Sequence, residues 1–253
     1  MTIPFRLDGK QILVTGASSG LGRSIAVEAS HAGARVVLMA RNEERLRETA
    51  ALCENDPVTV AYDLTADPDE IPRMIRKVTQ KFGPLAGLVH AAGVCPSVPL
   101  RALKTAHFME TYLLNVVVGA LLLKGLSSNG CYTDGGASGV LLSSVTGHVG
   151  HPGIAAYCAS KGGVELLAKS LSFELTPLHI RVNTVAPSII RTPMAEKAHS
   201  VLTRESLDNL MKTLPGGLGK PEDVAAAVIF LLADASRFIT GTSILVDGGY
   251  CAG

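Results

Sequence analysis

Apolar runs and helix-like segments alternate along the whole chain. The apolar runs contain little polar alternation, and they cover 11–15, 35–39, 58–62, 85–90, 139–143, 179–185 and 243–246. Helical patterns cover 24–31, 42–53, 67–82, 104–126, 155–176 and 221–232, and Asp67 is expected to cap the third of these helices. Short apolar strands separated by helices are typical of a parallel sheet that is covered on both sides. The pattern therefore predicts an α/β fold, a doubly wound parallel sheet with helices on both faces.

The chain shows no internal repeat and no linker rich in proline or serine, so we expect a single domain over residues 1–253. Two segments interrupt the alternation. Residues 127–138 form a polar, glycine-rich loop, and residues 192–219 form a long connection with a predicted helix at 205–213. Long connections in compact domains often cover or line a binding site. We therefore expect 192–219 to be a substrate loop.

Composition narrows the functional classes. The chain has 253 residues, of which 47% are hydrophobic and 18% charged, and this composition indicates a globular protein. Its net charge is +1 and its charged residues show no basic cluster, which argues against nucleic-acid binding. The five cysteines include no CxxC pair, which favours reduced thiols and a cytoplasmic protein. The start of the chain lacks the apolar core of a signal peptide, and the most apolar stretch, 113–123, is too short to cross a bilayer. Histidines and cysteines lack metal-ligand spacing, so no metal site is expected.

A glycine-rich turn, TGASSGLG at 15–22, follows the first predicted strand and opens the first helix. Glycines let a phosphate approach the backbone, and the N-terminus of a helix offers free N–H groups and the positive end of its dipole. A tight turn without a ligand is the alternative that this motif alone leaves open. The residues expected to hold nucleotide phosphates are Gly16, Ser18, Ser19, Gly20, Leu21 and Gly22.

The end of the second strand bears on the choice of nucleotide. An acidic residue there would favour NAD, whereas an arginine can pair with the 2′-phosphate of NADP. Ala40 occupies the acid position and Arg41 follows it, which favours NADP(H) and leaves NAD(H) open. Arg41 at the start of a solvated helix is the alternative. Asp63 and Leu64, after the third strand, are expected to meet the adenine, or else to form a simple turn.

Four motifs together resemble the short-chain dehydrogenase/reductase family over nearly the whole chain. The glycine turn matches the family's TGxxxGxG motif, and Tyr157 and Lys161 match its YxxxK motif. Ser144, thirteen residues before Tyr157, matches the catalytic serine, and Asn115 matches the fourth catalytic member. The resemblance implies a Rossmann fold and an oxidoreductase that interconverts a ketone and a secondary alcohol with a nicotinamide cofactor.

The residue types suit this chemistry. A tyrosine hydroxyl has a pKa near 10, and a nearby cation is expected to lower it. Residues four apart share a helix face, so Lys161 is expected beside Tyr157, which would act as general acid in reduction and general base in oxidation. Ser144 would hold the substrate oxygen. By family analogy, Lys161 would bind the nicotinamide ribose and Asn115 would hold a relay water. Taken alone, the tyrosine and lysine match an ordinary helix pair, and the serine matches a strand-end turn.

The sequence departs from the family's pattern at two cofactor motifs. The usual NNAG is replaced by HAAG at 90–93, which keeps the glycine and loses both asparagine side chains. Hydrogen bonds that those side chains supply must therefore come from elsewhere. The usual PG motif appears with a serine in place of glycine, which puts the local backbone geometry in doubt. Further cofactor contacts are expected from Ala91, Ala92, Gly93, Pro187, Ser188, Ile190 and Thr192.

Substrate contacts are expected from Ser144, Val145, His151 and Tyr157. The nearest subgroup by resemblance is that of the 3-oxoacyl-(acyl-carrier-protein) reductases, on the segments 218–225 and 239–250. Those reductases dock the acidic carrier through two arginines, and this chain has Leu178 at one of these positions and Gly135 near the other. Because both arginines are missing, a carrier-bound substrate is kept only as the alternative to a free ketone. A non-catalytic, cofactor-sensing protein is a second alternative. The family also implies a homo-oligomer, a tetramer or a dimer, built on 155–176 and the C-terminal segment.

Overall fold

A computed structural model describes residues 5–193, 195 and 214–252. At its centre is one seven-stranded sheet in the order β3-β2-β1-β4-β5-β6-β7, and every neighbouring pair of strands is parallel. This arrangement confirms the predicted doubly wound α/β fold. The strands are β1 (Gln11–Thr15), β2 (Arg35–Ala40), β3 (Val58–Ala61), β4 (Gly87–His90), β5 (Ala137–Leu142), β6 (Ile180–Pro187) and β7 (Ser243–Val246).

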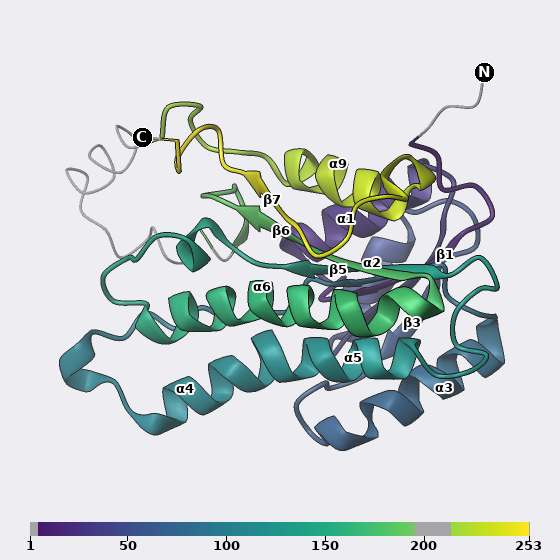
Figure 1. Ribbon diagram of the computed structural model, residues 1–253, viewed down its shortest axis with the longest axis horizontal. Coiled ribbons are helices and arrows are strands. Elements are labelled where there is room, and N and C mark those ends of the chain that lie inside the picture. Colours follow the sequence, from purple (N-terminus) through teal and green to yellow (C-terminus); the bar gives the residue numbers. More distant parts are fainter. Residues whose placement is uncertain (1–4, 194, 196–213, 253) are drawn as a thin grey trace.

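Helices cover both faces of the sheet (Figure 1). One face carries α1 (Gly20–His31), α2 (Glu43–Ala50) and α9 (Pro221–Leu232). The other face carries α3 (Ile71–Phe82), α4 (Thr105–Tyr112), α5 (Val118–Leu126) and α6 (Ala155–Leu175). Successive strand residues feed opposite cores: Ile12 and Val14 join the first, and Leu13 joins the second. Burial on both faces explains why these strands show no polar alternation.

Two helix starts differ from the predictions. The first helix begins at Gly20, four residues before the expected start, because Gly20 takes a φ of 54° and Gly22 fits where a Cβ would lie 2.4 Å from the carbonyl oxygen of Gly16. Asp67 does not cap α3. It precedes a short 3-10 turn, Pro68–Glu70, and its side chain makes no capping bond.

The predicted helix 104–126 is helical from Thr105 to Leu126 but not regular. Its middle, Leu113–Val117, is one turn of π-helix between α4 and α5. The whole helix Thr105–Leu126 is the one helix among the described residues that is long and apolar enough, by length and composition, to cross a membrane. Its inner face packs in the core through Val118, Leu122 and Leu126, whereas Met109 on the outer face is 66% exposed. The apolar character of this helix is therefore explained, on its inner face, by packing in the core.

The strand order indicates at which edge of the sheet a ligand would bind. All strands are parallel, so their carboxyl ends gather at one edge of the sheet, and the order reverses between β1 and β4. Ligands of open α/β sheets bind in the crevice at such a reversal. The glycine turn after β1, the HAAG segment after β4 and Ser144 after β5 therefore meet at this edge. The predicted helix 205–213 and most of the predicted substrate loop lie outside the described residues.

Candidate active site

The glycine turn is packed directly against the segment after β4. Gly16 has a φ of 68°, and a Cβ on it would lie 2.8 Å from the backbone nitrogen of Ala92. The Thr15 hydroxyl oxygen accepts hydrogen bonds from the backbone N–H groups of Ala91 and Ala92, both at 3.2 Å. At the other side, Thr192 methyl and Cβ atoms lie 3.8 Å from the Cβ position of Gly20. The expected phosphate-binding residues thus form one cradle at the N-terminus of α1.

His90 makes two side-chain hydrogen bonds at the motif that lacks the asparagines. Its Nε2 lies 2.9 Å from the carbonyl oxygen of Leu114, which only accepts, so Nε2 carries the proton. Its Nδ1 then accepts from the Thr15 hydroxyl at 2.9 Å. Burial lowers the pKa of His90 to about 4, so the ring is neutral near pH 7. The substituted motif therefore keeps its connection between β1, β4 and the π-helical turn.

The residues expected to distinguish NADP from NAD lie at the ends of β2 and β3. Arg41 is exposed, and it lies near enough to Asp63 to lower the pKa of that carboxyl. The larger effect on the same pKa comes from Thr65, whose hydroxyl and backbone N–H both donate to Asp63 Oδ1, at 2.7 and 2.9 Å. The Leu64 side chain is buried in the core, so only its backbone can meet a nucleotide.

Lys161 is buried at the centre of the site. Its Nζ donates to the carbonyl oxygen of Leu142 at 2.5 Å and lies 5.5 Å from the centroid of the Tyr157 ring. Burial lowers the pKa of Lys161 to about 8. Part of Tyr157 reaches solvent, yet its surroundings raise the pKa of its hydroxyl, chiefly by burial, and a hydrogen bond with Ser144 lowers it in part. The expected lowering of the tyrosine pKa is therefore not found.

Ser144 and Asn115 complete the expected set. Ser144 Oγ accepts from the Thr146 backbone at 3.2 Å, and the two hydroxyl oxygens lie 3.0 Å apart. The Asn115 side chain sits in the π-helical turn, where its Oδ1 accepts from Val94 N at 2.9 Å. Its Nδ2 donates to Val94 O and to Ser160 Oγ, both at 3.0 Å. Asn115 therefore ties the segment after β4 to α6, beside Tyr157 and Lys161.

Comparisons with known proteins agree with this geometry. A family model described as enoyl-(acyl carrier protein) reductase matches residues 16–251. The chain is 35% identical to a 3-oxoacyl-[acyl-carrier-protein] reductase of Thermotoga maritima, over 96% of this chain and 98% of that protein. It is 32% identical to an NADP-dependent (R)-specific alcohol dehydrogenase of Lentilactobacillus kefiri, over 98% of each. A short-chain type dehydrogenase/reductase from Mycobacterium marinum superposes with a TM-score of 0.89 at 29% identity, covering 99% of this chain and 98% of that one.

The chain belongs to the short-chain dehydrogenase/reductase family. It is therefore an enzyme, an oxidoreductase that acts on CH–OH groups with NAD(P). Ser188, which replaces the glycine of the family's PG motif, fits the local backbone conformation of this dehydrogenase/reductase. Ser188 has no positive φ, its N–H donates to Val246 O at 3.1 Å, and its hydroxyl donates to Asp247 O at 3.3 Å.

Two histidines in the loop after β5, His148 and His151, have different surroundings. His151 is exposed, and its Nδ1 lies 3.0 Å from the carbonyl oxygen of Pro152. His148 is paired with Glu165, a contact that the sequence did not suggest. Cys95 and Cys158 lie near enough to Tyr157 to affect its pKa, and burial raises the pKa of Cys95 to about 11. Val145 is buried.

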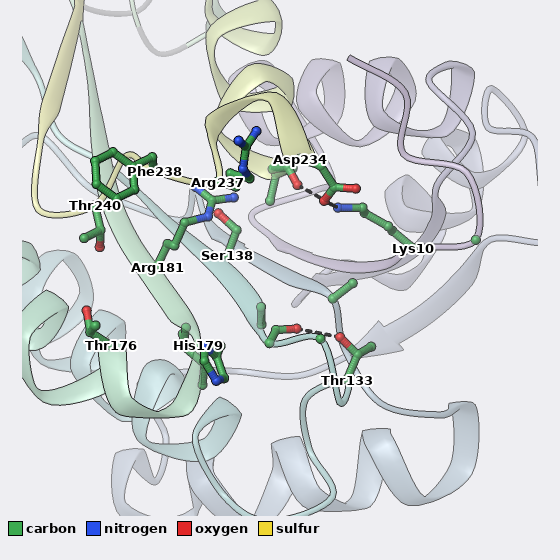
Figure 2. A pocket seen from close by; sticks show the side chains of 17 residues that line it. Lys10, Thr133, Ser138, Thr176, His179, Arg181, Asp234, Arg237, Phe238 and Thr240 are labelled. Carbon is green, nitrogen blue, oxygen red and sulfur yellow. Dashed lines mark hydrogen bonds and ion pairs between the residues drawn. The ribbon is translucent and has the colours of Figure 1, made fainter. Parts of the chain in front are cut away.

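A cavity of about 720 Å³ lies away from this site, at the opposite, amino edge of the sheet (Figure 2). Lys10 is ion-paired with Asp234 there, and Arg181 donates to Leu231 O at 2.8 Å, at the C-terminal end of α9. Lys10 Nζ also donates to Leu232 O at 3.4 Å, so both cations bind carbonyl oxygens at the C-terminal end of α9. Within the described ranges, no three histidine, cysteine, aspartate or glutamate side chains gather as a metal site.

Proposed function

We propose that this enzyme reduces a ketone to a secondary alcohol with NADPH. The observation that carries the proposal is the placement of Ser144, Tyr157 and Lys161 together at the sheet edge that also holds the glycine cradle. The cradle suits the phosphates of a dinucleotide because the N-terminal N–H groups of α1 open onto it and its N-cap residue, Ser19, makes no side-chain capping bond. The Gly16–Gly22 turn, the Ala91–Gly93 segment and the Pro187–Thr192 segment would hold the cofactor.

The bound cofactor would supply a hydride to the carbonyl carbon. Tyr157 would donate its proton to the carbonyl oxygen as the C–O double bond becomes single, so that the alcohol forms in its neutral state. The raised pKa of the Tyr157 hydroxyl favours the protonated form that reduction needs. Ser144 would donate a hydrogen bond to the same oxygen and stabilise its developing charge. Lys161 would bind the nicotinamide ribose and, when charged, favour the tyrosinate left after proton transfer.

NADPH is proposed over NADH because of Arg41. The exposed guanidinium follows Ala40, and no carboxylate occupies the end of β2 to repel a 2′-phosphate. The relative from Lentilactobacillus kefiri is named as NADP-dependent, which agrees with this assignment. Asp63 is proposed as the adenine contact, because it follows β3 at the same sheet edge as the cradle and an ionised carboxylate can accept a hydrogen bond from the adenine amine.

The substrate is proposed to be a free ketone, which would meet Val145 and His151 beside the catalytic residues. The alternative is a 3-oxoacyl thioester on an acyl carrier protein, as the name of the Thermotoga maritima relative suggests. The two carrier-docking arginines of that subgroup are absent at Leu178 and Gly135. Of the cations that line the amino-edge cavity beside these positions, Lys10 and Arg181 are already bound to protein groups (Figure 2).

The test is a screen that follows NADPH oxidation with free ketones and, separately, with β-ketoacyl thioesters. Turnover of ketones supports the proposal, and turnover of carrier-bound thioesters alone favours the alternative. No turnover on either, together with tight NADPH binding, would favour a cofactor-sensing protein. The proton donor, the hydrogen-bond donor and the buried lysine together argue against the sensor.

We further propose that residues 1–253 form a single cytoplasmic domain that assembles into a homo-oligomer. One continuous sheet draws strands from both halves of the chain, and the five cysteines are free thiols. Large apolar side chains point to solvent from α6 and the C-terminal segment, which are the expected contact surfaces. They are Leu166, Phe173, Phe238 and Leu245. Light scattering would distinguish a dimer from a tetramer and would reject the assembly if it gave a monomer.

A further inference from the structure

Glu165 extends the catalytic face of α6 by one turn. Tyr157, Lys161 and Glu165 are spaced by four residues, so they share one face of the helix. Three consecutive residues at the end of β5 meet this face. The residues on either side of Ser143 contact Lys161 and Tyr157, and the Ser143 hydroxyl donates to Glu165 Oε1 at 2.8 Å.

The Glu165 carboxylate is buried and receives several hydrogen bonds. Besides Ser143, the Ser243 hydroxyl donates to Oε1 at 3.1 Å from β7, and His148 Nε2 lies 2.8 Å from the same oxygen. Glu165 is 8% exposed. Burial of a carboxylate is costly unless such partners compensate it. A leucine of similar volume would avoid that cost, so the carboxylate is better explained by what it positions.

Ser143 and His148 bracket the turn that carries Ser144. The turn lies against α6, because a Cβ on Gly147 would lie 3.0 Å from the backbone nitrogen of Gly162. Within the turn, the backbone N–H of Gly147 donates to Ser144 O at 2.8 Å. One carboxylate therefore contacts both ends of the segment 143–148, which carries the Ser144 hydroxyl next to its first residue.

We propose that Glu165 is a positioning residue for carbonyl reduction, and that by binding Ser143 and His148 it keeps the Ser144 hydroxyl aligned with Tyr157. The inference rests on the proposed function, since alignment matters only if Ser144 binds a reacting oxygen. Glu165 itself touches neither substrate nor cofactor. Its removal should therefore slow turnover while leaving the cofactor cradle intact.

The test replaces Glu165 in the full-length enzyme. Glu165→Leu should lower kcat for the best ketone by about 10- to 100-fold, because a small misalignment of a catalytic group has effects of this size. The Kd for NADPH should stay within about twofold, since the Gly16–Gly22 turn is untouched. Glu165→Gln keeps an accepting oxygen and should recover most of the lost kcat. Ser243→Ala, which removes only the bond from β7, is the matched control and should keep kcat near that of the parent.

Equal losses of kcat in Glu165→Leu and Ser243→Ala, or a kcat in Glu165→Leu within about twofold of the parent, would overturn the proposal. Hydrogen exchange separates this failure from failure of the proposed function. In Glu165→Leu, the backbone amides of Gly147 and Val149, both bonded within the turn, should exchange faster. If the parent turns over no ketone, the proposed function fails, and unchanged exchange at these amides would still decide against Glu165 as the clamp.

Discussion

The Thr15 hydroxyl and the His90 imidazole lie 2.9 Å apart and join the strand that ends in the phosphate turn to the strand that ends in the HAAG segment. The Thr15 oxygen accepts two backbone N–H groups, so its own proton is free for His90 Nδ1. On its other side, the ring donates to Leu114 in the π-helical turn next to Asn115. A neutral histidine is therefore built into the connection between the cofactor cradle and the catalytic helices.

Stability should depend on pH through His90. Its pKa is about 4 in the fold and about 6.5 in the unfolded chain, so the unfolded state binds the proton first as the pH falls. The free energy of unfolding should thus decrease from pH 6.5 to pH 4, by up to about 3 kcal/mol. Urea unfolding of His90→Asn, which cannot titrate, should show a flatter profile over this window. Identical slopes for the parent and the variant would contradict the assignment.

Tyr157→Phe should abolish most activity and keep the cofactor. Loss of a general acid reduces turnover by about 10²- to 10⁴-fold, whereas the cradle at α1 does not involve the hydroxyl. NADPH oxidation and fluorescence titration of NADPH measure the two properties separately. The control is Tyr112→Phe, the same chemical change on α4, where the hydroxyl faces Gly163. Full activity in Tyr157→Phe would refute the mechanism.

Arg41→Ala should weaken NADPH more than NADH. A charge-assisted bond to the 2′-phosphate contributes about 1.5–3 kcal/mol, so the Kd for NADPH should rise at least about tenfold. The Kd for NADH should change little. Arg47→Ala is a suitable control, because Arg47 on α2 is paired with Glu43 at 2.6 Å. An equal loss for both nucleotides would remove the NADP preference.

Gly16→Ala should damage the cradle far more than Gly9→Ala. Both glycines have a positive φ, 68° and 72°, so both variants carry a backbone penalty of about 1 kcal/mol. Only Gly16 also faces a close neighbour, Ala92 N at 2.8 Å from its Cβ position, whereas Gly9 has open space. Thermal unfolding and the NADPH Kd should both separate the variants. Similar values for the two would show that the close approach is unimportant.

The sequence predicted those parts of the fold that depend on local pattern. The central strands were recognisable because burial on both faces leaves each an apolar run, and the edge strands β3 and β7 keep apolar runs although they are only partly buried. The alternation of strands and helices predicted a parallel sheet, whose strand order the structure then supplied. The contacts of His90 and Glu165 were not predictable, because their partners come from elements far apart in the chain. The raised pKa of Tyr157 likewise depends on burial, which the four-residue spacing to Lys161 does not reveal.

The π-helical turn has a consequence for how this chain can vary. A π turn holds one residue more than an α turn, and it lets α4 face α6 while α5 faces α3. Deleting a single codon within 113–117 would restore the ordinary pitch and rotate one half of the helix by about 100° against the other. Either Asn115 or the apolar seam of α5 would then point the wrong way. The length of this helix is thus constrained to the residue, and a one-residue deletion here should disturb the fold more than a substitution at the exposed Val117.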